Sequence, residues 1–80
     1  MRVLGDIPHP LFKVTLFAWN GKYLLKLEKG SLEQTFKLDE LDFTEEEVKS
    51  LVTHEGFMQS AEARFQDMGK AMGQALQDLT

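Results

Sequence analysis

The sequence predicts an α+β domain in which a three-stranded antiparallel β-meander precedes one short and one long C-terminal helix, both packed on one sheet face. Apolar and polar residues alternate on both sides of Asn20-Gly21, which indicates a β-hairpin. A helix-start pattern follows, and apolar residues then recur at spacings of three and four. We expect a single domain over residues 1–80, with residues 1–9 extended, the meander over 10–38, a short helix over 44–55 and a long helix over 58–79.

The Asn20-Gly21 dipeptide sets the register of the first hairpin. A two-residue type I′ turn needs positive φ at both central positions, which asparagine and glycine tolerate. Because opposite residues in a hairpin share a face, this loop gives one sheet face an almost wholly apolar set of side chains. The set consists of Phe12, Val14, Leu16, Ala18, Tyr23, Leu25 and Leu27.

A second turn is predicted at Lys29-Gly30, which leads into the third strand. This loop places Phe36 opposite Tyr23, an apolar pair that agrees with the register of the first hairpin. It also places Gln34 opposite Leu25 on the apolar face. We therefore expect Gln34 to lie toward an edge of the sheet.

The first residues, "MRVLGDIPHP", are expected to lie outside the sheet because Pro8 and Pro10 forbid regular strand pairing. The apolar run before Gly5 is too short for a signal peptide, and no segment approaches the length of a membrane span. We therefore expect a cytoplasmic location.

The stretch "LDFTEEEV" marks the start of the short helix. Thr44 can cap the backbone and Glu47, three residues later, completes a capping box. The acidic side chains in this region are explained by the helix macrodipole, which stabilises anions near a helix N-terminus. Gly56 is expected to end the short helix.

Composition excludes several kinds of chemistry. The 80 residues contain no cysteine, so disulfides, thiolate zinc sites and thiol catalysis are ruled out. Residues 1–38 carry six basic and three acidic side chains, whereas residues 39–80 carry three and ten. Such asymmetry is typical of a solvated helix start, and it also occurs in proteins with a nucleic-acid-binding face or an electrostatically matched partner.

No catalytic, cofactor-binding or metal-binding motif is present in the sequence. His9 and His54 match no ligand spacing, and Ser31, Ser50 and Ser60 lack the context of an activated nucleophile. We therefore expect no enzyme activity, no cofactor and no metal.

Trp19, the only tryptophan, is predicted to lie on the second, more polar sheet face. That face carries an apolar island rimmed by lysines, and an exposed island of this kind needs a partner. Three explanations compete: association with a second copy or another protein, burial beneath the N-terminal segment or the short helix, and stacking of single-stranded nucleic acid. The candidate interaction patch comprises Phe17, Trp19, Lys22, Leu24, Lys26 and Lys37.

The long helix carries an apolar stripe whose first half is expected to cover the sheet. At ~1.5 Å per residue this helix is longer than the sheet is wide, so its C-terminal part is expected to overhang. The candidate oligomer seam on that part comprises Met68, Met72, Ala75 and Leu79.

These patterns together predict a small non-enzymatic protein-interaction or regulatory module. A homodimer or a protein partner is expected, and no membrane partner. The alternative function is single-stranded nucleic-acid binding through Phe17, Trp19 and the lysine face of the sheet.

Overall fold

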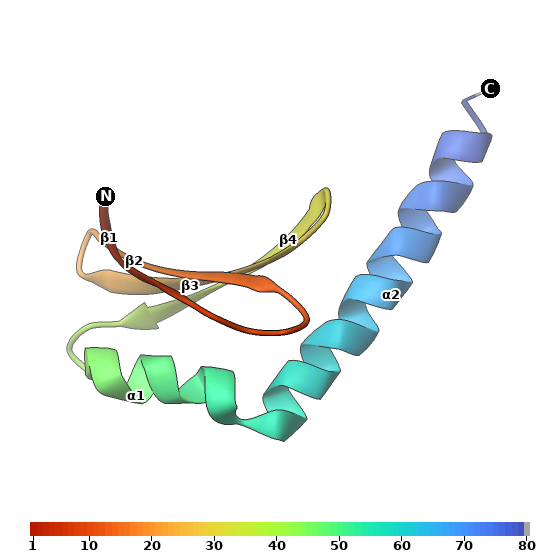
Figure 1. The fold of residues 1–80 in the computed structure, drawn as a ribbon. Helices are drawn as coiled ribbons and strands as arrows, with labels where there is room; N and C mark the ends of the chain where they lie inside the picture. Colours follow the sequence, from red (N-terminus) through yellow and green to blue (C-terminus); the bar gives the residue numbers. More distant parts are fainter. Residues whose placement is uncertain (80) are drawn as a thin grey trace.

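A computed structural model describes residues 1–79 and shows a four-stranded antiparallel sheet followed by helices (Figure 1). The α+β class, the antiparallel sheet and the C-terminal helix are confirmed, whereas the prediction of three strands is wrong. The strand order is β1-β2-β3-β4, so each strand pairs with its neighbours in sequence. The elements are β1 (Arg2–Ile7), β2 (Lys13–Trp19), β3 (Lys22–Lys29), β4 (Leu32–Asp39), α1 (Glu45–Ser50), the 3₁₀ turn η1 (Leu51–Thr53) and α2 (Glu55–Gln77).

The additional strand, β1, lies in the segment predicted to be extended and unpaired. Pro8 and Pro10 follow the strand rather than interrupt it, so they do not prevent pairing with β2. A register shift between Val3 and Gly5 leaves Leu4 as an extra residue, and Leu4 packs against the core. The N-terminal segment therefore extends the sheet instead of crossing either face.

The first hairpin has the predicted register. Trp19 is paired with Lys22 and Leu16 with Leu25. Asn20 has φ 52° and Gly21 φ 73°, the positive values that a type I′ turn requires.

In the second hairpin, the residues of β4 pair with residues of β3 that lie two positions away from the predicted partners. Its loop is Gly30-Ser31 rather than Lys29-Gly30, and Gly30, with φ 61°, occupies the first central position as in a type II′ turn. Phe36 consequently pairs with Leu25 instead of Tyr23. Because the shift is an even number, every side chain of β4 stays on its predicted face.

The helical segment also begins and ends differently from the prediction. The Thr44–Glu47 capping box is present, but α1 stops at Ser50 and η1 carries the chain to Thr53. His54 then caps α2, because its Nδ1 accepts a hydrogen bond of 3.0 Å from the Phe57 N–H. Helix α2 thus begins at Glu55, and Gly56 lies in its first turn instead of ending the short helix.

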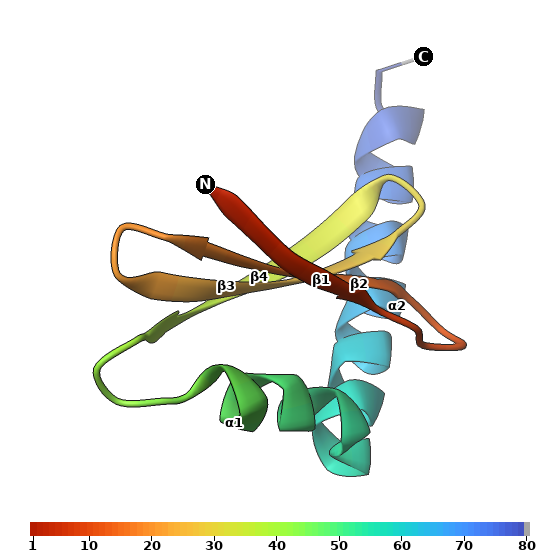
Figure 2. The same cartoon turned by 60° about the vertical axis from the view of Figure 1, so that its left-hand side comes forward.

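The helices cover one face of the sheet (Figures 1 and 2), and the core lies between these two layers. We call this the helix face and the opposite one the open face. Leu16, Leu25 and Leu27 of the two central strands have no exposed surface. The buried core comprises Phe12, Val14, Leu16, Leu25, Leu27, Val48, Val52, Met58, Ala61 and Phe65.

Gln34 lies on edge strand β4, as predicted, and joins the sheet to α2. Its Nε2 donates a hydrogen bond of 2.9 Å to the Ala61 carbonyl, and its Oε1 accepts one of 2.9 Å from Nε of Arg64. A polar side chain at the apolar face is therefore satisfied by the helix that covers it.

Helix α2 runs antiparallel to β4 and continues beyond the sheet, as its length predicts (Figure 1). Near its start, the ring of Phe57 lies 5.1 Å from that of Phe36. Twelve residues later, a Cβ added at Gly69 would lie 3.8 Å from Cδ1 of Leu32. All residues from 70 to 77 are exposed, and we call this part the α2 overhang.

We expect Leu25→Ala to lower the free energy of unfolding by about 2–5 kcal/mol, because it leaves a cavity between the sheet and the helices. Urea denaturation measures the effect. Leu41→Ala is the matched control: Leu41 is 94% exposed, and its truncation should cost no more than about 0.5 kcal/mol. Equal losses in the two variants would contradict the described core.

Candidate interaction surface

The apolar island predicted on the open face is present, but its members are unequally exposed. Phe17 pairs with Leu24, and Trp19 lies two residues further along the same strand. Trp19 is 47% exposed and Phe17 is half-buried, whereas Leu24 is only 7% exposed. Neither the N-terminal segment nor the short helix buries Trp19.

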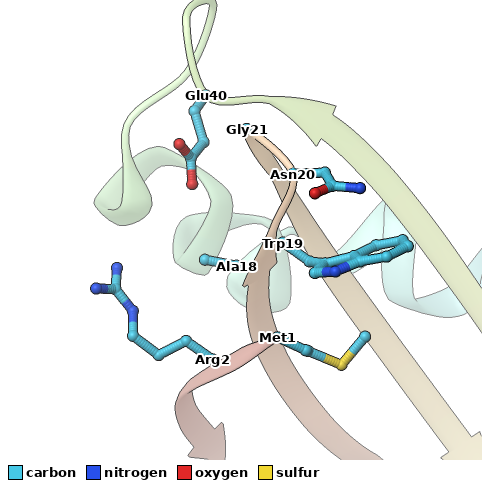
Figure 3. A pocket seen from close by; sticks show the side chains of 7 residues that line it. All are labelled: Met1, Arg2, Ala18, Trp19, Asn20, Gly21 and Glu40. Atoms are coloured by element: carbon cyan, nitrogen blue, oxygen red, sulfur yellow. The ribbon is translucent and has the colours of Figure 1, made fainter.

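Strand β1 and the residue before it add two apolar residues that the sequence interpretation missed. Val3 pairs with Phe17 and so lies on the open face, where it is exposed. Met1 is 73% exposed, and Figure 3 shows its side chain extending to the same side of β2 as Trp19. The sequence could have revealed both only if β1 had been recognised as a strand. We call Met1, Val3, Phe17, Trp19 and Leu24 the open-face patch.

A shallow hollow of about 320 Å³ lies beside the first hairpin turn (Figure 3). Met1 and Trp19 lie on one side of β2, while Arg2 and Glu40 extend on the other side, past Ala18. The lining contains an amide, a guanidinium and a carboxylate but no nucleophile with an adjacent base. The hollow therefore presents polar and charged side chains beside the exposed Met1 and Trp19.

The charges of the open face are balanced. Lysine and carboxylate residues on this face number four each. The lysines are Lys13, Lys22, Lys26 and Lys37, and the carboxylates are Asp6, Glu28, Glu33 and Asp39. A face without net charge lacks the cationic excess that phosphate backbones require.

The three lysines of the predicted patch have different surroundings. Lys26 is partly covered, and its Nζ lies 3.1 Å from Oε2 of Glu33 and 4.0 Å from Oε1 of Glu28. Lys22 and Lys37 are exposed, and neither forms an ion pair within residues 1–79. Only these two remain available for charges brought by a partner.

The hydrogen bond to Glu33, with the nearby Glu28 carboxylate, raises the pKa of Lys26 above its ordinary value of 10.5. Because the folded-state pKa is raised, the ion pair stabilises the fold from neutral pH up to that ordinary value. Its contribution disappears as the pH rises through the higher folded-state pKa.

Both histidines have structural roles. His9 stacks on Phe12 with ring centroids 5.4 Å apart, and its Nδ1 accepts a hydrogen bond from the Leu11 N–H. His54 caps α2. In the part of the chain that the structure describes, no three His, Asp or Glu side chains converge as a metal site would require.

The predicted oligomer seam lies at the free end of α2. Met68 is half-buried against the core, whereas Met72 is 52% exposed and Leu79 is 80% exposed. Ala75 is exposed as well, and Leu76, which the sequence interpretation omitted, adds to the same stripe. Among the described residues, nothing covers the seam beyond Met68.

Comparison of the chain with protein families, with curated proteins and with solved structures finds no match. Across residues 1–79, no helix combines the length and apolar character needed to cross a membrane.

We expect the NMR-measured pKa of Lys26 to lie above 10.5 and to fall in Glu33→Gln, since the variant removes the largest cause of the shift. The lysine CεH₂ signals followed through an alkaline titration report this value. Glu45→Gln, which breaks the separate Lys49–Glu45 pair, is the control and should leave Lys26 unchanged. Identical pKa values in wild type and Glu33→Gln would contradict the described ion pair.

Proposed function

We propose that this chain is a small non-enzymatic protein-interaction module and that the open-face patch is its principal binding surface. The observation that carries the proposal is the half-exposed Trp19, which lies beside Met1 on the sheet face that the helices leave uncovered. An exposed cluster of large apolar side chains on a small domain is typical of a protein-binding surface.

The chemical make-up of the patch favours a protein over nucleic acid. Tryptophan, phenylalanine and methionine are enriched among the anchors of protein interfaces, where they contribute most of the binding energy. Single-stranded nucleic acid also stacks on aromatic side chains, but its phosphates need a cationic surround. The lysines of the open face are matched by an equal number of carboxylates, and Lys26 is already paired.

The α2 overhang is the second surface that supports association. Its apolar stripe continues for two turns without covering the sheet, and an isolated helix end is marginally stable in water. Met72 and Leu76 offer flexible, adaptable contact area of the kind found at interfaces that bind helices. A partner that covers this stripe would stabilise the end of α2.

We expect Trp19→Ala to weaken self-association or partner binding at least about tenfold, because a central aromatic anchor contributes about 2 kcal/mol or more. The free energy of unfolding should change little, since nearly half of the side chain is already in water. Sedimentation and urea denaturation measure the two effects. Leu11→Ala is the matched control, because Leu11 is 46% exposed but lies outside the patch.

The fluorescence of Trp19 provides the first test, since it is the only tryptophan. An emission maximum that moves to the red as the protein is diluted would place a second copy on the patch. A water-like maximum at every concentration would leave the patch free for a different partner. Tight, saturable quenching by a single-stranded oligonucleotide would favour the nucleic-acid alternative, and collapse of the fold in Trp19→Ala would contradict the proposal.

A further inference from the structure

Within residues 1–79, no strand pairs with the outer edge of β4, so backbone groups along that edge lack partners in the sheet. Strand β4 is last in the strand order. The hydrogen bond of 2.9 Å from the Glu40 N–H to the Gly21 carbonyl shows which backbone groups of β4 point toward β3. In an antiparallel ladder the direction of the backbone groups alternates along a strand, so those of even-numbered residues of β4 bond to β3 and those of odd-numbered residues point away from it. The backbone N–H and C=O groups of Glu33, Thr35 and Lys37 therefore face solvent.

The two edges of the sheet differ in how well they are protected. Strand β1 has six residues, is irregular at Leu4 and is followed by Pro8, all of which discourage further pairing. Strand β4 has eight residues with no proline and no bulge. An edge of this length without a proline or a bulge is a template for another strand.

We propose that two copies of this chain pair through their β4 strands, antiparallel about a twofold axis at Thr35, to form one continuous eight-stranded sheet. This surface is distinct from the open-face patch, so the inference does not rest on the proposed function. An antiparallel pairing of identical strands places its twofold axis perpendicular to the sheet, which keeps the helices of both copies on the same side. Residue i then lies opposite residue 70−i of the other copy.

Charge complementarity selects this register. With the axis at Thr35, Glu33 of each copy lies opposite Lys37 of the other, which forms two opposite-charge pairs in an otherwise neutral ladder. With the axis one residue further on, Glu33 would face Asp39, and like charges would meet twice. With the axis one residue earlier, Lys37 would face Ser31 and no charges would be matched. Lys37 has no ion-pair partner within residues 1–79, so the pairing supplies one.

The helix side of the same edge offers an apolar groove to the second copy. The groove, of about 460 Å³, is lined in part by Phe36, Leu38, Leu51 and Phe57. In the proposed register, Leu32 of the second copy lies opposite Leu38 and hence at this groove. Because Leu32 is itself half-exposed, the pairing buries apolar surface from both copies.

The pairing also brings the exposed ends of the two copies together. The α2 overhang continues past the Leu32 end of its own β4, and the second copy's chain after Leu38 lies at that same end. That chain carries Leu41, which is 94% exposed, and Phe43, which is also exposed. Two exposed apolar segments thus lie at the same end of the paired strands, twice in the dimer.

Charge-reversed variants test the register directly. In Lys37→Glu, glutamates at 33 and 37 face each other across the axis, and in Glu33→Lys, lysines do. We expect each variant alone to dimerise at least about tenfold more weakly than wild type, measured as the sedimentation Kd at low salt. An equimolar mixture restores both opposite-charge pairs, and we expect it to dimerise with an affinity near that of wild type. Circular dichroism establishes that each variant is folded.

A backbone variant tests the pairing without changing charge. The Thr35 N–H points away from β3, so Thr35→Pro removes a donor from the proposed interface and none from the monomer. We expect Thr35→Pro to be a folded monomer and Thr35→Val, which retains the N–H, to dimerise as wild type does.

A wild-type chain that stays monomeric at about 100 μM would overturn the proposal, because productive edge pairing should be evident at that concentration. Failure of the charge-reversed mixture to regain affinity would overturn it too. Support for β4 pairing independent of the open-face patch would come from three results together. The β4 variants change the dimer Kd, Trp19 emission does not change on dimerisation, and Trp19→Ala dimerises with the wild-type Kd.

Discussion

The two-residue turn at Asn20-Gly21 is the constraint on which the rest of the structure depends. Its positive φ values twist the chain so that β2 and β3 pair in a single register, and that register gathers the fully buried leucines onto one face. Once this face exists, it must be covered, because a half-apolar sheet in water is unstable. The helices supply the cover, and the opposite face stays open.

The helices cover only one face of the sheet, and α2 extends beyond the sheet that it covers. Helix α1 and η1 bring Val48 and Val52 to the core, and α2 adds Met58, Ala61 and Phe65 over its first three turns. Met68 and Gly69 still lie against the core and β4, and only the α2 overhang, residues 70–77, has no sheet beneath it. Two consequences follow from the same packing: an aromatic cluster is exposed on the open face, and an apolar stripe is exposed at the end of α2. Both features that suggest association therefore arise from how the core is built.

Much of the fold could be predicted because the informative signals are local. A turn dipeptide, alternation of side chains and a capping box each act over a few residues, so the first hairpin, the start of α1 and the overhang of α2 were predicted correctly. The predicted register of the second hairpin was wrong because two loops, Lys29-Gly30 and Gly30-Ser31, both contain the glycine. Only the backbone conformation shows that Gly30 takes the first central position of the turn. Strand β1 was missed because its pairing with β2 depends on tertiary contacts, and the neighbouring prolines suggested otherwise.

The two errors, the shifted register of β4 and the unpredicted strand β1, affected the predicted surface to different extents. The reason is that an even register shift keeps side chains on their face. A two-residue error in β4 left its side chains on the predicted faces, so Gln34 still pointed toward the helices and Lys37 still lay on the open face. Missing β1 was more serious, since it concealed Met1 and Val3 and hence the true extent of the open-face patch. A strand adds a new row of side chains to a face, whereas an even slip only moves a row along it.

The way α2 is attached also explains why an edge of the sheet is available. The helix is held to β4 by the side chain of Gln34, an even-numbered residue whose own backbone is bonded to β3. Helix α2 therefore contacts β4 on the helix face of the sheet. It does not cover the outward-pointing backbone groups of the odd-numbered residues of β4. Had the helix been attached around the edge, those groups would have been shielded as the bulge and proline shield β1. Cover from one side gives the domain its core, and the same geometry leaves a free strand edge with Glu33 and Lys37 two residues on either side of Thr35.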